Sequence, residues 1–185
     1  MPLGDQFDAV LGAARAGGDW AWRELYRDTA PALAGYLRAR GVTDVDDVVG
    51  DTFMTVVERI GSFSGGEPSF RAWIFTIGRN LAIDAYRART RRPTDPTPMD
   101  VLAETGPQGD VEADALAQLG RERVISVLEA LTHDQRDVLL LRILGGLSID
   151  EVATVTHRNV GAVKMLQHRG IGALRREIAR GAVTL

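Results

Sequence analysis

The chain has 185 residues, 45% of them hydrophobic, and a formal net charge of −3. This length suits one domain or two small ones. No apolar run approaches the roughly 20 residues that a membrane span needs, and the N-terminus lacks the basic and apolar regions of a signal peptide. The absence of cysteine excludes disulfides and thiolate metal sites. The three histidines also lack metal-ligand spacing, so we expect no metal and no cofactor. The lack of cysteine fits the cytoplasm, where we expect the protein to be.

The charges are unevenly distributed along the chain. Residues 93–115 contain six acids and no base, whereas residues 158–185 contain six bases and one acid. A run of arginines directly precedes the acidic segment: Arg87, Arg89, Arg91 and Arg92. Basic patches separated by an acidic spacer indicate nucleic-acid binding, which the total charge conceals.

Three helices are predicted in the first sixty residues. The first covers about 5–15, and the second begins near Asp19 and ends at Gly41, which suits the residue after a helix. Thr43 is expected to cap the third, "DVDDVVGDTFMTVVERI", whose acidic first turn suits the helix dipole. Its wide apolar stripe indicates a buried helix, or alternatively a surface for a partner.

A Gly- and Ser-rich loop, residues 61–69, is expected before a fourth helix that starts near Pro68. This helix, "FRAWIFTIGRNLAIDAYRARTRR", interleaves aromatic residues with arginines. Such a pattern suits single-stranded nucleic acid, where bases stack and phosphates pair. The alternative is an ordinary helix with a solvated basic end. Trp73 is expected in the core.

Residues 93–115 hold four prolines and the six acids and are predicted to be a flexible linker. The linker separates two domains, at residues 1–92 and 116–185. In the second domain, capping boxes at Thr132–Gln135 and Ser148–Glu151 each start a helix. Gly145 and Gly146 are expected to end the helix that starts at the first of these capping boxes.

The last third of the chain, "LSIDEVATVTHRNVGAVKMLQHRGIGALRREI", is predicted to be a helix-turn-helix. The second helix carries apolar residues on one side and basic residues on the other. The alternative is an amphipathic hairpin with a solvated basic face. Gly170 and Gly172 lie inside this helix and each costs roughly 1 kcal/mol relative to Ala. No strand pattern, nucleotide-binding glycine motif or catalytic set is found, so we expect an all-α protein that is not an enzyme.

Four segments now carry a resemblance: "WRELYRDTAPALAGYLRARG", "DVDDVVGDTFMTVVERI", "FRAWIFTIGRNLAIDAYRAR" and the helix-turn-helix. In this order, and split by an acidic linker, they resemble the extracytoplasmic-function group of the sigma-70 family. The resemblance implies an all-α chain with sigma region 2 (1–92) and sigma region 4 (116–185). Gly50 and Val57 depart from the Gln and Trp common in the family.

The resemblance also implies contact residues in each domain. In region 2, the third helix docks on RNA polymerase, while the loop and fourth helix capture a flipped base of the −10 element and hold phosphates. In region 4, the recognition helix reads the −35 element. The implied residues are Asp47, Val48, Asp51, Phe53 and Val56 for polymerase; Phe63, Arg79, Asn80 and Arg87 for the −10 element; and Arg142, Arg158, Lys164, Met165, His168 and Arg169 for the −35 element.

We therefore expect a factor that directs core RNA polymerase to promoter DNA and aids promoter opening, with an anti-sigma factor as a further partner. One alternative is a stand-alone helix-turn-helix regulator that never binds polymerase. Another is an enzyme with an appended DNA-binding domain. Polymerase retention of the purified chain discriminates the first alternative, and turnover discriminates the second.

Overall fold

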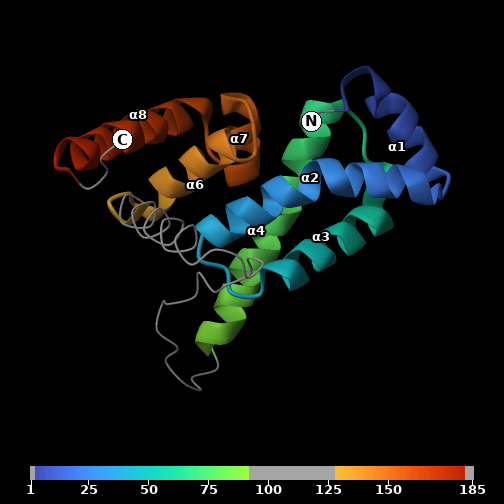
Figure 1. Cartoon of the computed structure of the whole chain (residues 1–185), viewed down its shortest axis with the longest axis horizontal. Coiled ribbons are helices and arrows are strands. Elements are labelled where there is room, and N and C mark those ends of the chain that lie inside the picture. The colour runs from blue at the N-terminus through green and yellow to red at the C-terminus, as the bar shows by residue number, and fades with distance from the viewer. Residues whose placement is uncertain (1–2, 92–127, 182–185) are drawn as a thin grey trace, which may run out of the picture.

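A computed structural model describes residues 3–91 and 128–181 of the chain. Every regular element in these two ranges is a helix, which confirms the all-α prediction. Helices α1 to α4 form one half of the molecule and α6 to α8 the other (Figure 1). The predicted linker, residues 93–115, lies outside the described residues, so the domain boundaries stay a prediction.

The chain begins with a short 3-10 helix, η1 (Gly4–Gln6), followed by α1 (Phe7–Arg15) and α2 (Asp19–Ala39). The end of α2 is as predicted. Gly41 has a φ of +79°, and its N–H donates to the carbonyl of Arg38 at 2.9 Å. The N–H of Val42 donates to the carbonyl of Leu37 at 3.1 Å, which completes a Schellman motif. This motif fixes the direction in which the chain leaves α2.

The next elements are α3 (Val45–Arg59), η2 (Ile60–Ser62) and α4 (Glu67–Arg91). The predicted cap at Thr43 is wrong. The N-cap residue of α3 is Asp44, which makes no side-chain capping bond; the Thr43 hydroxyl donates instead to the Asp44 carboxylate at 3.1 Å. Pro68 lies in the first turn of α4, as predicted.

Close packing of α4 on α2 and α3 forms the core of the first half. At Gly78 of α4, a Cβ would lie 2.9 Å from Leu33 Cδ1 and 3.2 Å from Thr52 Oγ1. Real Cβ atoms essentially never approach as closely as 2.9 Å, so any larger residue here would force the Leu33 side chain to shift. The apolar stripe of α3 is buried here apart from Val57, which is 47% exposed.

The second half consists of α6 (His133–Ile143), α7 (Ile149–Thr156) and α8 (Val160–Ala179). Both predicted capping boxes are confirmed. Thr132 exchanges two hydrogen bonds with Gln135, at 3.1 and 3.3 Å, before α6. Ser148 exchanges two with Glu151, at 2.6 and 3.2 Å, before α7. The sequence therefore specifies both helix starts through local chemistry.

The turn between α7 and α8 completes a helix-turn-helix. His157 ends α7 in the left-handed region, with a φ of 53°. Asn159 then caps α8, because its Oδ1 accepts the N–H of Ala162 at 2.7 Å. The predicted helix-turn-helix is confirmed.

The two halves share one continuous hydrophobic core. Helix α4 packs against α7, and α2 packs against α6. A Cβ at Gly145 would lie 3.3 Å from the ring of Phe75, and Leu141 and Leu147 are fully buried. The two predicted units are therefore in direct contact, which the sequence pattern did not indicate.

Candidate nucleic-acid interface

The exposed side of α8 gathers the residues predicted to read duplex DNA. Lys164, Met165, His168 and Arg169 are all exposed, and Met165 is exposed to 46%. Their spacing places them on one face of the helix. A helix with an exposed polar and cationic face of this kind fits the major groove. Base and phosphate contacts of these residues stay a prediction.

The opposite side of α8 packs against α6 and α7. Val163 is fully buried, and a Cβ at Gly170 would lie 2.9 Å from Leu139 Cδ1 of α6. Gly172 faces more open space, where the nearest atom is the Arg176 guanidinium at 3.6 Å. The two glycines expected only to weaken the helix therefore differ, because Gly170 permits the close approach of α8 and α6.

Two other predicted −35 contacts are engaged inside the domain. The Arg142 guanidinium donates to the carbonyl oxygen of Leu147 and is half-buried. Arg158 forms an ion pair with Asp134 at 2.7 Å. Both arginines thus brace the helix-turn-helix, and a role in DNA contact stays a prediction.

Phe63 and Asn80, the predicted base-capture pair, are separated in the structure. The ring of Phe63 stacks on Trp73, with centroids 5.1 Å apart, and meets the edge of Phe70 at 5.3 Å. Asn80 is exposed and lies seven residues beyond Trp73 on α4, which is about 10 Å along the helix axis. Trp73 packs against the core, as predicted. Phe63 therefore belongs to an aromatic cluster at the loop, and Asn80 lies apart from it.

Arg79, predicted to hold a phosphate, is instead bound to Asp137 of α6. Its Nε donates to Asp137 Oδ2 at 2.8 Å. Asp137 Oδ1 accepts from the Tyr36 hydroxyl at 2.6 Å and from Arg40 Nη1 at 2.5 Å. The side chains of Asp137, Arg40 and Arg79 are only 4%, 7% and 14% exposed. In this conformation Arg79 is therefore not available to DNA. We call Tyr36, Arg40, Arg79 and Asp137 the interface cluster.

The surroundings of the interface cluster favour the carboxylate form of Asp137. Burial acts to raise the pKa of Asp137, but Arg40 and the hydrogen bonds from Tyr36 and Arg79 outweigh it and hold that pKa below its usual value. Burial, and then the nearby Asp137, raise the pKa of Tyr36 far above its ordinary range. The cluster therefore comprises one carboxylate, one neutral phenol and two guanidinium groups.

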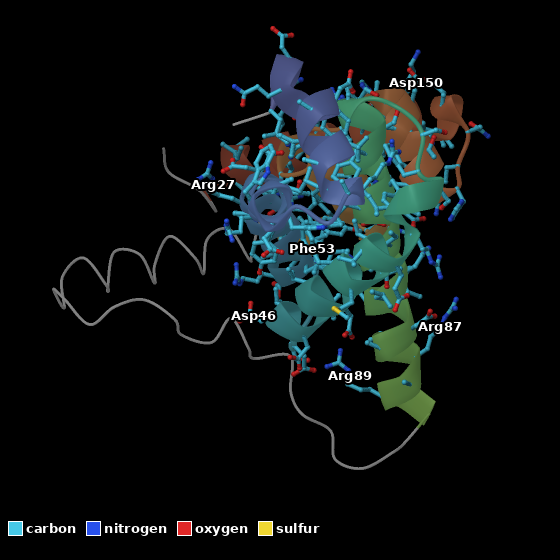
Figure 2. The ribbon with its side chains drawn as sticks, turned by 90° about the vertical axis from the view of Figure 1, so that its right-hand side faces the viewer. Arg27, Asp46, Phe53, Arg87, Arg89 and Asp150 are labelled. Carbon is cyan, nitrogen blue, oxygen red and sulfur yellow. The ribbon has the colours of Figure 1, made fainter. Side chains whose placement is uncertain are left out.

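Arg87 and Arg89 lie near the C-terminal end of α4, away from the second half of the molecule (Figure 2). Arg87 pairs with Asp84 at 3.6 Å, and both side chains are largely exposed. Arg89 lies 3.8 Å from Asp44 and donates to the Thr43 hydroxyl. This end of α4 therefore presents cations to solvent, and the predicted phosphate contact of Arg87 stays a prediction.

The residues predicted to bind polymerase on α3 divide by burial. Asp47 and Asp51 are exposed, whereas Val48 is 6% exposed and Val56 is fully buried. Val48 and Val56 face the core in this structure, and their contact with polymerase stays a prediction. Phe53 is 8% exposed and contributes only an edge to the surface. The cause is the width of the apolar stripe, of which only one side reaches solvent.

An apolar groove between α2 and α3 was missed by the sequence analysis. It is lined by Trp22, Arg23, Tyr26, Phe53 and Val57. The rings of Tyr26 and Phe53 lie 4.7 Å apart, and Tyr26 is 50% exposed. Met54, on the adjoining turn of α3, is 62% exposed. An exposed apolar patch of this kind marks an interaction site.

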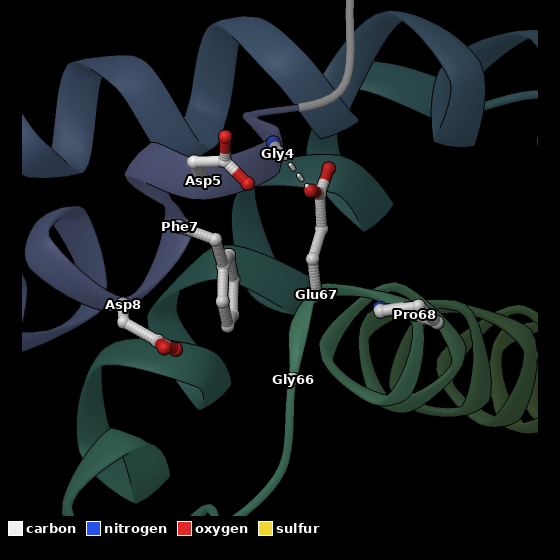
Figure 3. Close-up of a pocket in the computed structure, with 7 residues that line it drawn as sticks. All are labelled: Gly4, Asp5, Phe7, Asp8, Gly66, Glu67 and Pro68. Carbon is white, nitrogen blue, oxygen red and sulfur yellow. Dashed lines mark hydrogen bonds between the residues drawn. The ribbon is translucent and has the colours of Figure 1, made fainter.

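A second hollow lies between the N-terminus and the start of α4 and is lined by carboxylates (Figure 3). Glu67 accepts the N–H groups of Leu3 at 2.9 Å and Gly4 at 2.7 Å. Asp5 and Asp8 face the same hollow. Its charge is the wrong sign for nucleic acid, and its hydrogen bonds instead fasten the N-terminus to α4. Among residues 3–91 and 128–181 no group of acids and histidines could hold a metal ion.

Sequence reasoning also missed the interface cluster. A signal existed in Asp137, an acid followed directly by the apolar run Val138 to Leu141 on a helix that had to be buried. A buried acid needs cationic partners. The partners, however, lie about 60 and 100 residues earlier in the chain, so only the tertiary contact of α6 with α2 and α4 identifies them.

Comparison with known protein families finds two matches in chain order. The family described as Sigma-70 region 2 matches residues 25–92, and the family described as Sigma-70, region 4 matches residues 121–174. The first contains α3, α4 and most of α2, and the second contains α6, α7 and most of α8. Helix α1 lies outside both matched ranges.

Individual proteins are similar over most of their length. The ECF RNA polymerase sigma factor SigD of Mycobacterium tuberculosis is 31% identical over 185 residues, which cover 95% of this chain and 85% of SigD. The RNA polymerase sigma factor CnrH of Cupriavidus metallidurans is 35% identical over 170 residues, which cover 85% of this chain and 86% of CnrH. The solved structure of CnrH in complex with the cytosolic domain of CnrY has a TM-score of 0.69 at 28% identity, covering 95% of this chain and 99% of that chain.

Proposed function

The chain belongs to the extracytoplasmic-function group of the sigma-70 family, and we propose how its described surfaces carry out the work of such a factor. It is an RNA polymerase sigma factor, which directs core polymerase to specific promoters. The observation that carries the proposal is the exposed cationic face of α8 on a fully capped helix-turn-helix. The domain assignment follows the sequence: region 2 over 1–92, a linker over 93–115 and region 4 over 116–185.

Core polymerase docks on the outer face of α3 and the groove beside it. Asp47, Asp51, Met54 and Val57 form one exposed stripe, at spacings of three and four residues. The stripe has acids at its N-terminal end and apolar side chains at its other end, where Val57 also lines the groove. A polymerase surface with apolar and basic residues is its complement.

Promoter opening depends on the other side of region 2. Asn80, exposed on α4, hydrogen-bonds an extruded non-template base of the −10 element, while the loop at Phe63 supplies stacking surface. Arg87 holds a phosphate near the end of α4. Arg79 joins it only after release from Asp137.

Region 4 reads the −35 element in the major groove with Lys164, His168 and Arg169. Lysine and arginine bind guanine edges or phosphates, and Met165 offers an apolar contact to a thymine methyl group. Arg142 and Arg158 stabilise the helix-turn-helix through Leu147 and Asp134 and lie beside the DNA backbone in the complex. The mechanism is binding, and polymerase performs the nucleotidyl transfer.

An anti-sigma factor is the further partner we propose. It is supported by the complex of CnrH with the cytosolic domain of CnrY, since that sigma factor has the same fold over 95% of this chain. Within the described residues no helix is long and apolar enough to cross a membrane. We place the protein in the cytoplasm because its binding partners, core polymerase and promoter DNA, are located there.

Run-off transcription with core polymerase on fragmented DNA from the source genome tests the function. Discrete transcripts that require the protein support it, and their aligned start sites give both promoter elements. Absence of transcripts, with duplex binding retained and no retention by immobilised core polymerase, would mean a stand-alone helix-turn-helix regulator.

Asn80→Ala tests the base-capture role separately. We expect it to reduce permanganate reactivity of thymines in the −10 region while duplex binding stays close to that of the parent protein, because the contact forms only after a base is extruded. Unchanged reactivity would remove Asn80 from the proposal without affecting the assignment of region 4.

A further inference from the structure

The loop between η2 and α4, residues 63–66, is held from the α4 side by aromatic contacts. Phe63 stacks on Trp73 and meets Phe70, as described above. Gly65 has a φ of +137°, and a Cβ there would lie 3.0 Å from Ser69 Cβ and 3.5 Å from Phe63 Cζ. The loop is therefore tightly packed at its centre, although most of its residues are exposed.

From the other side, one arginine of α1 binds the backbone carbonyl groups at the start of η2 and directly after it. Arg15 Nε donates to the carbonyl oxygen of Ile60 at 3.2 Å, and Arg15 Nη2 donates to the carbonyl oxygen of Phe63. A guanidinium presents its donors in a rigid planar fork, whereas a lysine ammonium is a single point. Arg15 therefore fixes two carbonyl groups relative to each other.

Helix α1 is itself anchored to the start of α4. Phe7 is 3% exposed and its ring lies 5.5 Å from that of Phe70. Glu67 accepts the N–H groups of Leu3 and Gly4 (Figure 3). Arg15 thus extends from a fixed helix, and its hydrogen bonds transmit that position to the loop.

We propose that Arg15 is a positioning residue for capture of the −10 base, and that α1 belongs to the apparatus that reads this element. Arg15 makes no base contact. It holds the Phe63 backbone so that the stacking surface is formed before the extruded base arrives, which reduces the ordering that binding requires. This inference rests on the proposed function of the loop.

The test uses holoenzyme with a promoter identified by run-off transcription, carrying 2-aminopurine in the −10 non-template strand. For Arg15→Ala we expect opening to slow about tenfold, the effect of losing roughly 1.4 kcal/mol of hydrogen bonding. Arg15→Lys restores less than half of the loss, because one ammonium cannot hold both carbonyls. Polymerase binding and duplex binding stay unchanged. Arg27→Ala is the charge-matched control, because Arg27 is 77% exposed and pairs with Glu24 of the same helix.

The base preference at the −10 element separates positioning from simple loss of fold. Relaxed preference in Arg15→Ala at unchanged melting temperature supports the proposal, and Glu67→Gln, which loosens the anchor of α1, produces a smaller change in the same direction. Opening rates and base preference equal to those of the parent protein would overturn it. If the parent holoenzyme itself gives no opening, the proposed function fails instead.

A second inference comes from the contact between the two halves. Promoter elements near −10 and −35 are about 25 base pairs apart, or roughly 85 Å along straight DNA at about 3.4 Å per base pair. In the structure α4 packs on α7, and α7 packs on α8. Packed helices lie about 8–10 Å apart, so the recognition helix is roughly 20 Å from α4. The described conformation therefore cannot read both elements at once.

The interface cluster is what ties the halves together through polar groups. We infer that Tyr36, Arg40, Arg79 and Asp137 form a latch that keeps the free sigma factor closed, and that core polymerase opens it. The latch withholds Arg79 from DNA while the chain is free. This inference also depends on the two-element function, and its closed state can be measured without promoter DNA.

A charged latch suits reversible opening. Buried ions lose hydration on closure, and their mutual attraction only partly offsets that loss. When the halves separate, the carboxylate and both guanidinium groups regain water. The cluster thus selects one closed arrangement and adds little to its net stability, while opening also separates the apolar contacts between the halves.

Because the sequence contains no cysteine, two can be introduced as label sites for distance measurement. Gly12→Cys places one on α1, where a Cβ meets nothing within 4 Å, and Arg175→Cys places one on the exposed side of α8. Helices α1 and α8 lie toward opposite ends of the closed molecule (Figure 1). Energy transfer between the labels should report one distance in the free protein and a changed distance with core polymerase. Asp137→Asn should shift the free protein toward the distance measured with core polymerase, and Asp134→Asn on the same helix should not.

Two outcomes would overturn the latch: an unchanged distance when core polymerase binds, or a free Asp137→Asn variant with the distance of the parent protein. Circular dichroism checks that the variant stays helical. Tyr36→Phe provides a second variant, which removes the hydrogen bonds that the hydroxyl makes with Asp137 and Arg40 and leaves every charge in place. In transcription, Asp137→Asn should reach half-maximal activity at a severalfold lower concentration than the parent.

Discussion

Two sets of cationic side chains in this sigma factor have opposite environments. Arg40 and Arg79 are buried between the halves and neutralised by Asp137, whereas Lys164 and Arg169 stand exposed on α8. All four belong to helices that the sequence predicts, and three of them, Arg79, Lys164 and Arg169, were predicted to bind DNA. The comparison teaches that burial and partner, rather than charge, decide whether a cation is available to a ligand.

The largest expected effect comes from removing the buried anion. Asp137→Ala leaves Arg40 and Arg79 without their counter-charge, which should lower the free energy of unfolding by about 3 kcal/mol. Urea denaturation followed by circular dichroism measures it. The matched control is Asp134→Ala, since its ion pair with Arg158 has side chains 38% and 46% exposed and should contribute about 0–1 kcal/mol. Equal losses in the two variants would contradict the distinction.

The exposed cations should show the reverse pattern. Lys164→Ala and Arg169→Ala should each weaken binding to a −35 duplex by about tenfold, with stability changed by less than about 0.5 kcal/mol. Fluorescence anisotropy at several salt concentrations separates phosphate from base contacts, because each lost phosphate contact reduces the salt slope by about 1. Retention by core polymerase should be unaffected. Loss of both activities together would mean that these residues act through folding.

The two glycines of α8 sharpen the comparison between its buried and exposed sides. Gly170→Ala forces a Cβ toward Leu139 and should destabilise the protein by about 1 kcal/mol or more. Gly172→Ala meets only the Arg176 side chain and should stabilise by up to about 1 kcal/mol through helix propensity. Thermal melts of the pair report both signs. The same sign for both substitutions would show that packing does not distinguish them.

Local chemistry explains which features could be predicted from the sequence. Capping boxes at Thr132 and Ser148, the Schellman glycine at Gly41 and the helix-turn-helix depend on neighbouring residues. Burial on α3 was harder, since a wide apolar stripe does not reveal which edge faces solvent. Val56 and Val57 are adjacent, yet one is fully buried and the other 47% exposed.

Long-range pairing accounts for what the sequence could not reveal. Arg79 resembles any cation on an aromatic-rich helix until Asp137, 58 residues later, is brought to it. Arg15 similarly finds the carbonyls of Ile60 and Phe63 only through the packing of α1 on α4. These contacts connect segments whose separation in sequence carries no periodic signal, so the tertiary structure was needed to find them.

The smallest expected effect is a dependence of closure on mildly acidic pH, through His133 at the edge of the interface cluster. Its Nε2 lies 2.9 Å from Arg40 Nη2, and because arginine only donates, the imidazole must accept. Burial, and then Arg40, lower the pKa of His133 from 6.5, against the opposing effect of Asp137 and Asp134. Because the pKa of His133 is lowered, its favourable contribution to the closed state is complete above pH 6.5. That contribution is lost as the pH falls through 6.5 toward the folded-state pKa. The pKa of Asp137 is lowered from 3.8, so its own contribution is lost only in stronger acid.

Energy transfer between the label sites, measured from pH 7.5 to 5.5, should therefore shift slightly toward the open distance. The variant His133→Gln keeps an acceptor but cannot be protonated in this range, so it should abolish the shift. A shift of equal size in His133→Gln would assign the pH dependence to another group.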